Sequence, residues 1–224
     1  MTQGIAFFDF DDTLARGDSI LPFLLYCIRK RISPRRQLVK AAGAFLYWKL
    51  RPSRASRASR ASRAKSATLS FLKGRSADEM LDVARAFFRD EYLPRFYQDG
   101  LTELWSLRSQ GMKLVVVSAS PDVYMRALPE FMPIDAVLST RCEVGSDGRY
   151  TGQVGENCKG EEKVRRIEQY LKENGFVLDM KCSSAYGDSP SDADMMALVN
   201  RAVLVNPKKA LLRRRPDGIV VHWT

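Results

Sequence analysis

The chain has 224 residues, 45% of them hydrophobic and 28% charged, which is enough for a buried core with a smaller appended domain and too apolar for a disordered protein. Its only histidine is His222, so the sequence disfavours a Ser-His-Asp hydrolase, a Cys-His enzyme and a histidine-ligated zinc site. Catalysis is therefore expected to use carboxylates, hydroxyls and lysines, and such oxygen ligands favour Mg²⁺ over a softer metal.

The first predicted element is a short apolar strand within residues 4–13, which ends in the carboxylate-rich turn DFDDT. Because acidic residues follow Phe7 and Phe8 at once, no secretory signal is expected here. From residue 19 to about residue 98 the pattern is helical, and Ser76 followed by Glu79 predicts a capping box for the last helix. Residues 54–63 repeat the triplet Arg-Ala-Ser, which we expect to form a solvated loop or a frayed helix.

Strands and helices alternate after residue 100. Residues 113–120 (KLVVVSAS) are a β-branched run typical of a buried parallel strand, and Asp147-Gly148 between alternating residues predicts a hairpin over 143–154. Helices are also expected over 101–110, 123–128 and 160–175, and strands over 136–138, 181–188, 201–207 and 218–223. This alternation predicts an α/β fold with a doubly wound parallel sheet, formed by residues 1–16 and 100–224 and interrupted by a helical insert over residues 17–99.

Charge is divided unevenly between these two parts. Of the 36 basic residues, 15 lie in residues 19–77, which contain no Asp or Glu, leaving 21 basic against 26 acidic residues in the rest. Such a basic segment predicts an anionic partner. A nucleic acid is disfavoured as that partner, because no aromatic residue interleaves the Arg-Ala-Ser triplets.

The insert also contains two apolar runs, over residues 20–28 and 41–50, and both are shorter than the about 20 residues that a bilayer crossing needs. Basic residues flank both runs, and the aromatic residues among them are Phe23, Tyr26, Phe45, Tyr47 and Trp48. This composition is typical of helices that lie in the interface of an anionic membrane, although the same faces could pack as an ordinary core with solvated arginines. Together with four scattered cysteines, expected to be reduced, it predicts a cytoplasmic protein that is either free or peripheral on the inner membrane face.

Polar side chains follow several of the predicted strands. Because the carboxyl ends of parallel strands meet at one edge of a sheet, we expect these side chains to form an acidic pocket there. The set comprises Asp9, Asp11, Ser118, Asp188 and Asp192, joined by either Lys163 or Lys159 from the start of the following helix.

The chemistry that suits this pocket is phosphoryl transfer. Carboxylates that hold Mg²⁺ would neutralise the charge that otherwise repels a phosphate. Asp9 could then attack phosphorus and form an aspartyl-phosphate, while Asp11 gives a proton to the leaving group and later takes one from water. Ser118 and backbone amides near Ala119 would donate to phosphate oxygens, and the lysine would screen the nucleophile.

In order along the chain, DFDDT, VVVSAS, a lysine at a helix start and YGDSPSD resemble the four motifs of the haloacid dehalogenase (HAD) superfamily. The resemblance covers essentially the whole chain, and the insert lies where C1-type members carry a helical cap. DGRYTGQV followed by CKGEEK is similar to subfamily IB, which includes phosphoserine phosphatases, and the texture is closest to the phosphatidylglycerophosphatase C-like branch. The resemblance implies a HAD-like fold. It also implies a phosphatase and not a dehalogenase, because HAD dehalogenases lack the carboxylate that Asp11 provides here.

The resemblance also implies roles for single residues. Mg²⁺ would meet Asp9, the backbone carbonyl of Asp11, and Asp188, with Asp192 mostly through water, whereas Asp12 is expected to make turn hydrogen bonds. Asp18 lies nine residues after Asp9, where phosphoserine phosphatases place a substrate-binding glutamate, but it could equally cap the first helix of the insert.

The catalytic lysine is ambiguous by resemblance. NCKGEE is similar to the NAKGE of phosphoserine phosphatases, which favours Lys159, whereas CxGxxK in the closer branch favours Lys163. We prefer Lys163, because its spacing to Asp188 fits one helix and a loop.

The substrate has two candidates, a lipid head-group phosphate such as phosphatidylglycerophosphate and a small soluble phosphomonoester of the phosphoserine or histidinol phosphate type. A non-catalytic phospho-accepting receiver domain is the alternative from another class, but that fold needs about half this length and lacks the DxDxT turn. A module that only binds anions through the basic insert would not need the Asp9–Asp11 pair.

Overall fold

The computed structural model describes residues 2–50 and 57–224. Residues 54–56 of the Arg-Ala-Ser triplets therefore lie outside the described residues. The same holds for the side chains of Phe45, Tyr47 and Trp48, on which the expected membrane-interface pattern partly depends.

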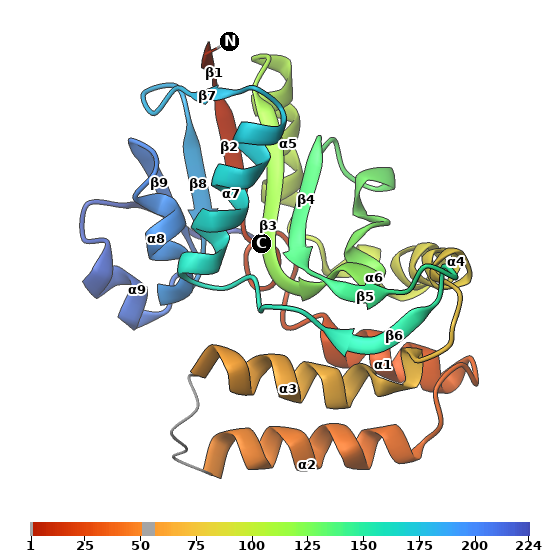
Figure 1. Ribbon diagram of the computed structural model, residues 1–224. Helices are drawn as coiled ribbons and strands as arrows, with labels where there is room; N and C mark the ends of the chain where they lie inside the picture. Colours follow the sequence, from red (N-terminus) through yellow and green to blue (C-terminus); the bar gives the residue numbers. More distant parts are fainter. Residues whose placement is uncertain (1, 51–56) are drawn as a thin grey trace.

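A six-stranded parallel sheet forms the centre of the described structure (Figure 1). Its order is β10-β9-β8-β2-β3-β4, with bounds Ile219–Val221, Arg201–Val205, Ser184–Gly187, Ile5–Phe8, Lys113–Pro121 and Ala136–Thr140. The chain winds in one direction from β2 to β3 and β4, and in the other to β8, β9 and β10. The predicted doubly wound α/β sheet is thus confirmed, and β2 lies at the point where the winding reverses, whose carboxyl edge is the usual place for a ligand.

Alternation along β2 explains why both faces of this sheet are covered. Ile5 and Phe7 belong to one buried hydrophobic cluster, whereas Ala6 and Phe8 belong to the other. Successive strand side chains point to opposite faces, so an uninterrupted apolar run requires a packed layer on each side.

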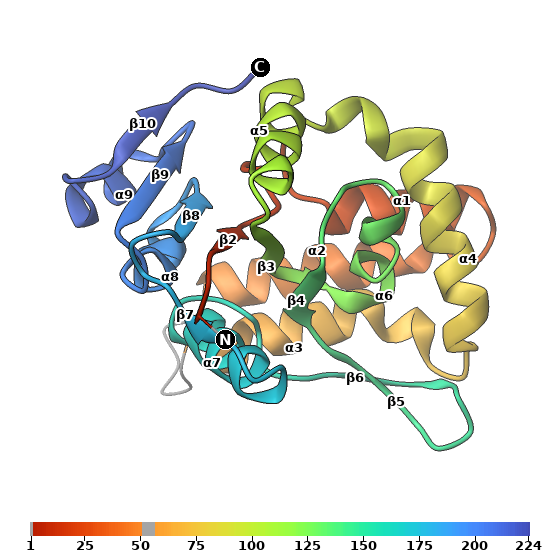
Figure 2. The same cartoon turned by 90° about the horizontal axis from the view of Figure 1, so that it is seen from above.

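The segment between β2 and β3 is helical, as predicted. It contains α1 (Ile20–Arg29), α2 (Arg36–Leu50), α3 (Arg57–Leu69) and α4 (Ala77–Phe87), and then α5 (Gln98–Ser109), which leads into β3. Figure 1 shows α2 and α3 side by side below the carboxyl ends of the strands, and Figure 2 shows α1 and α4 grouped near α6 (Asp122–Met125). Ser76 accepts the N–H of Glu79 at 3.5 Å, which confirms Ser76 as the N-cap of α4.

Part of the Arg-Ala-Ser repeat is helical. Because α3 begins at Arg57, residues 57–63 form its first turns, so of the two expected forms, a solvated loop and a frayed helix, the helix is the one found for them. Alanine and arginine have high helix propensity, and α3 packs along α2, so tertiary contact stabilises a helix that the three-residue period did not predict.

The predicted hairpin consists of β5 (Cys142–Val144) and β6 (Tyr150–Val154), paired antiparallel. In the turn between them, Gly148 has a φ of +74°, which a residue without a side chain adopts freely. Strand β6 packs against α3. The remaining α-helices are α7 (Glu161–Glu173), α8 (Ala193–Met196) and α9 (Lys209–Arg214). Strands β1 (Thr2–Gln3) and β7 (Val177–Leu178) form a short parallel pair that the sequence did not predict.

An aromatic cluster joins the sheet to the helical segment. Phe10, which directly follows Asp9, lies 5.9 Å from Tyr92 and 6.4 Å from Phe88, measured between ring centroids. Phe23 of α1 and Phe87 of α4 are 5.3 Å apart in the same buried cluster.

Within the part of the chain that the structure describes, no helix has the length and apolarity that a bilayer crossing requires.

Candidate active site

Three buried carboxylates meet at the carboxyl edge of the sheet. Asp9 follows β2, Asp188 follows β8, and Asp192 lies in the short turn after β8; one oxygen of each lies within 4.8 Å of the others. The N–H of Asp9 donates to the carbonyl of Tyr186 at 2.9 Å, so the sheet pairing continues one residue past β2 and fixes the backbone of Asp9. The expected acidic pocket is therefore present, with Asp9 at its centre.

Lys163, in the first turn of α7, joins these carboxylates. Its Nζ lies 2.7 Å from Asp9 Oδ1 and 2.7 Å from Asp192 Oδ1, and its side chain is 1% exposed. Although burial opposes its charge, the carboxylates of Asp192 and Asp9 raise the pKa of Lys163 above its ordinary value, so it is protonated at neutral pH. Lys159 is exposed and lies outside this contact, so the geometry favours Lys163 among the two candidates.

Asp192 has both carboxylate oxygens engaged within the protein. Oδ1 accepts from Lys163, and Oδ2 accepts the backbone N–H of Ser189 at 3.0 Å and its hydroxyl at 2.9 Å. These contacts form a capping box at the turn. Asp192 thus accepts three hydrogen bonds, whereas Asp9 accepts one at 2.7 Å from Lys163 and a long one at 3.5 Å from Thr13. Asp188 accepts from Lys208 at Oδ2, and no described residue donates to its Oδ1.

Asp11 lies in a hydroxyl network beside the nucleophile candidate. Its Oδ1 accepts the N–H of Ser19 at 3.0 Å and its Oδ2 accepts the hydroxyl of Ser120. The hydroxyl of Ser19 in turn lies 2.8 Å from that of Tyr124. Burial, with the nearby charge of Asp18, raises the pKa of Asp11 to about 7, which suits a group that gives and takes a proton near neutral pH.

Asp12, Thr13 and Asp18 hold the chain around this turn. Asp12 has a φ of +59°, and its Oδ1 accepts the N–H of Gly17 at 2.8 Å, as expected for a turn residue. Thr13 donates to Asp9 Oδ2 at 3.5 Å. Asp18 is exposed and lies one residue before Ser19, the N-cap of α1; its Oδ1 accepts the N–H of Ile20, the first residue of that helix, at 3.0 Å.

Ser118 and Ala119 lie where β3 becomes irregular. Ser118 is buried, and its hydroxyl accepts the N–H of Ser120 at 3.0 Å. The pairing of β3 with β4 shifts register between Ser118 and Pro121, which turns the backbone out of the sheet beside the carboxylates. The carbonyl of Ala119 accepts the hydroxyl of Thr140 at 2.6 Å.

Two lysines in the pocket were missed by the sequence analysis. Lys65 of α3 donates to the carbonyl of Ala119 and to Asn157 Oδ1, and burial lowers its pKa to about 8, opposed by Asp11 and Asp18. In the sequence it is one of 15 basic residues of the insert and gives no separate signal.

Lys208 is the second of these lysines. Its Nζ donates to Asp188 Oδ2 and to Asp12 Oδ2, the latter at 3.2 Å. Lys208 directly follows the loop after β9, so the strand-end criterion that selected Asp9 and Asp188 could also have found it.

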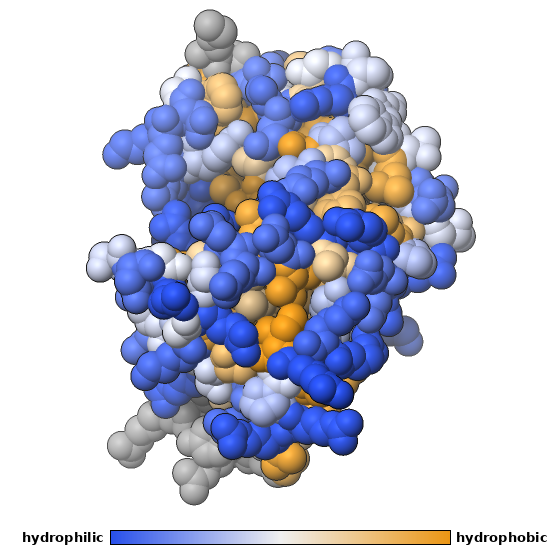
Figure 3. Space-filling view, turned by 90° about the vertical axis from the view of Figure 1, so that its right-hand side faces the viewer, coloured by the Kyte–Doolittle hydropathy of each residue, from blue (hydrophilic) through white to orange (hydrophobic). Residues whose placement is uncertain are grey.

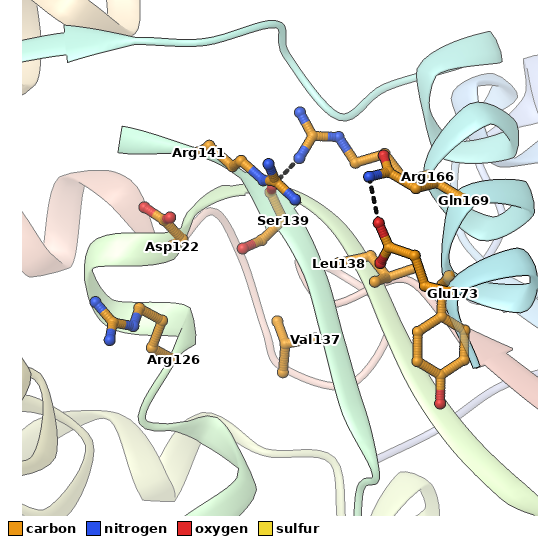
Figure 4. Close-up of a pocket in the computed structure, with 10 residues that line it drawn as sticks. Asp122, Arg126, Val137, Leu138, Ser139, Arg141, Arg166, Gln169 and Glu173 are labelled. Atoms are coloured by element: carbon orange, nitrogen blue, oxygen red, sulfur yellow. Dashed lines mark hydrogen bonds between the residues drawn. The ribbon is translucent and has the colours of Figure 1, made fainter. Parts of the chain in front are cut away.

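A separate hollow of about 170 Å³ lies beside β4 and α7 (Figure 4). Its polar groups already bind one another: Arg166 donates to the carbonyl of Ser139 at 3.0 Å, Gln169 donates to Glu173 at 2.6 Å, and Asp122 accepts the N–H of Cys142 at 2.8 Å. None of the expected site residues lines this hollow, so it lies apart from the acidic pocket.

The sequence of the chain matches a known family. Residues 6–197 match the haloacid dehalogenase-like hydrolases. The chain belongs to this family. The expected class of enzyme, a HAD-type phosphatase, is thereby confirmed, together with the resemblance on which it was based.

Relatives of the chain include proteins named as phosphatases. Protein CicA of Caulobacter vibrioides is 31% identical over 86% of this chain and 82% of its own. A histidinol-phosphatase of Neisseria meningitidis is 26% identical over 93% of each chain. The structure of a substrate-bound phosphoserine phosphatase shares the fold, with a TM-score of 0.63 and 18% identity over 98% of this chain and 93% of that one.

Proposed function

We propose that this HAD-type phosphatase hydrolyses phosphomonoesters through an aspartyl-phosphate on Asp9. The observation that carries the proposal is the contact of Asp9 with Lys163 at 2.7 Å inside a buried cluster that also contains Asp188 and Asp192. A carboxylate at the switch point of a parallel sheet, screened by a lysine, is suited to attack phosphorus.

The reaction needs two displacements at phosphorus. In the first, a carboxylate oxygen of Asp9 bonds to phosphorus while the bond to the ester oxygen breaks, and Asp11 protonates the departing oxygen. In the second, Asp11 takes a proton from water, whose oxygen attacks the aspartyl-phosphate and releases inorganic phosphate and free Asp9. Ser118, the backbone amides near Ala119, and Lys163 bind the phosphate oxygens during both steps.

Mg²⁺ fits the donor set of this site. The buried Asp9, Asp188 and Asp192 offer only oxygen, the ligand that Mg²⁺ prefers, from three directions within 4.8 Å. We assign the ion to Asp9, Asp188 and the backbone carbonyl of Asp11, with Asp192 acting through water because it already accepts three hydrogen bonds within the protein. When bound, the ion neutralises charge on the phosphate and so lowers its repulsion from Asp9.

Metal dependence tests this assignment. Activity on p-nitrophenyl phosphate should disappear in EDTA and return fully with added Mg²⁺. Equal Ca²⁺ should restore little, because calcium takes more ligands at longer distances and would misplace the phosphate. Full turnover in EDTA, or equal rates with calcium and magnesium, would contradict the proposed site.

We further propose that residues 17–99 form a cap over a core of residues 1–16 and 100–224, and that the cap selects the substrate through Lys65. Lys65 comes from α3 of the insert, and its Nζ reaches Ala119 at the irregular end of β3 and Asn157 in the loop before α7. A cation at this position favours a leaving group that is itself anionic, as in a lipid head-group phosphate such as phosphatidylglycerophosphate.

A small soluble phosphomonoester is the second candidate substrate. The Neisseria relative, which matches over 93% of each chain and is named a histidinol-phosphatase, favours it. In either case we place the protein in the cytoplasm, and the lipid substrate additionally requires access to the inner membrane face.

Replacing Lys65 separates these candidates. Lys65→Ala should lower kcat/KM about 30-fold for detergent-dispersed phosphatidylglycerophosphate, the usual worth of a hydrogen bond to a charged group. For p-nitrophenyl phosphate, whose leaving group has no second anion, the loss should stay within about threefold, as it should for the exposed-lysine control Lys73→Ala on both substrates.

A pH series gives an independent readout of the same residue. Lys65 loses its proton as the pH rises through about 8, so the preference for the anionic substrate should fall above that value. Lys65→Arg should keep the preference at high pH, because arginine stays charged. Equal losses on both substrates would assign Lys65 to the reaction itself and remove it as a selector.

A further inference from the structure

A large hollow lies beside the connection between α1 and α2, and none of the carboxylates of the acidic pocket lines it. It has a volume of about 760 Å³, within the range of natural ligand sites. We call it the arginine hollow, because its lining includes Arg29, Arg31, Arg35 and Arg75. In the lower half of Figure 3, where this connection faces the viewer, apolar atoms are exposed between strongly hydrophilic ones.

The charges of the arginine hollow are only partly neutralised. Arg29 pairs with Glu91, and Arg75 donates to the backbone carbonyl of Ile32. Arg31 and Arg35 make no side-chain hydrogen bond or ion pair with any residue that the structure describes, and both are exposed. Asp90 pairs with Lys30 at 3.6 Å beside the Arg29–Glu91 pair, so acidic residues do reach the α1 side of this surface. Residues 19–77 contain no Asp or Glu, so Arg31 and Arg35 have no acidic partner from their own segment.

Ser33 provides a second and independent observation. It lines the same hollow and is 3% exposed, yet within the described chain its hydroxyl has no hydrogen-bond partner. Its backbone N–H is satisfied by the carbonyl of Cys27 at 3.1 Å, so the segment is held in place. A buried hydroxyl without a hydrogen-bond partner costs free energy. A ligand that supplied an acceptor to the hydroxyl of Ser33 would remove this cost and so bind more tightly.

The neighbouring surface of α2 is apolar. Val39 is 74% exposed and Leu46 is 55% exposed, and their seven-residue spacing places them on one face of the helix. Arg35 directly precedes α2, which begins at Arg36, and it is exposed four residues before Val39. Arginines beside exposed aliphatic side chains are typical of helices that lie in a membrane interface.

We propose that the arginine hollow binds the phosphate group of an anionic membrane lipid. Arg31 and Arg35 would donate paired hydrogen bonds to the phosphate oxygens, and the hydroxyl of Ser33 would donate one more. Val39 and Leu46 enter the interfacial region of the bilayer beside it. This site is separate from the acidic pocket and does not depend on the reaction that we propose there.

Vesicle flotation with the full chain tests the proposal. At low salt the protein should float with vesicles of phosphatidylcholine that contain phosphatidylglycerol, and 0.5 M NaCl should release it. Arg31→Ala/Arg35→Ala should weaken this binding about 25-fold, roughly fivefold for each basic residue. Val39→Ser should weaken vesicle binding as well, because serine removes an apolar side chain that would enter the bilayer interface.

The matched control removes two positive charges elsewhere. Lys209→Ala/Arg213→Ala changes exposed residues of α9 and should leave flotation unchanged. The thermal unfolding midpoint of each variant shows whether it is folded. Absence of flotation in the wild type, or equal flotation of the Arg31/Arg35 variant and the control, would overturn the proposal.

Soluble glycerol 3-phosphate distinguishes the source of the phosphate. If the lipid surface is the ligand, millimolar glycerol 3-phosphate should leave the bound fraction of the protein nearly unchanged. Binding of glycerol 3-phosphate that is lost in the Arg31/Arg35 variant, without binding to vesicles, would assign the hollow to a free phosphate and reject the lipid.

Discussion

Asp9→Asn should reduce kcat on p-nitrophenyl phosphate by on the order of 10⁵-fold, comparable to the loss of the nucleophile in other hydrolases. The amide is nearly isosteric with the carboxylate but is a poor nucleophile. Lys163 keeps its contact with Asp192 at 2.7 Å, so the variant should fold, which circular dichroism can verify.

Asp135→Asn is the matched control. Asp135 precedes β4 and so lies at the amino edge of the sheet, opposite the acidic pocket, where it pairs with Arg108 at 2.6 Å and Lys113 at 3.1 Å. Its kcat should stay within about twofold, because the change removes an ion pair and no reacting group. If Asp9→Asn retained more than about 1% of wild-type turnover, Asp9 would not be the nucleophile.

Lys163→Ala should lower kcat about 10³-fold and also destabilise the fold by about 3 kcal/mol. Removing this cation leaves Asp9 and Asp192 buried without their partner, and the phosphate loses one of its donors. Steady-state kinetics and urea unfolding measure the two effects separately.

Lys159→Ala is the comparison that decides between the two lysines. Its side chain is exposed, so both kcat and the free energy of unfolding should change little. Lys163→Arg adds a variant that keeps the buried charge; it should fold, but its larger planar group should still slow the reaction. A greater loss of activity in Lys159→Ala than in Lys163→Ala would reverse the assignment.

The acidic pocket could be predicted because its members follow strands. Asp9 and Asp188 come directly after β2 and β8, and parallel neighbouring strands bring their carboxyl ends together whatever the loops do. Lys163 was ambiguous in sequence, because only three residues separate it from Lys159 at the start of the same helix. Only the rotation of α7 determines which of the two is buried.

Lys65 could not be predicted in this way. Its contact with Ala119 and Asn157 depends on how α3 packs over a strand end and a loop that are distant in sequence. The Arg-Ala-Ser triplets were difficult for a related reason, since α3 is stabilised by packing on α2 and not by an amphipathic pattern of its own. The contact of Lys65 and the helix formed by the triplets both belong to the insert, where tertiary contact outweighs local pattern.

The aromatic cluster around Phe10 limits how such an enzyme could be rebuilt. Phe10 stands between Asp9 and Asp11 in the sequence, and its ring packs on Phe88 and Tyr92, which follow the last helix of the insert. The two reacting carboxylates are therefore oriented in part by side chains of the helical segment. A chimera that exchanged this segment for that of a relative would have to transplant the rings that pack on Phe10 as well, or the spacing of its nucleophile and acid would be lost.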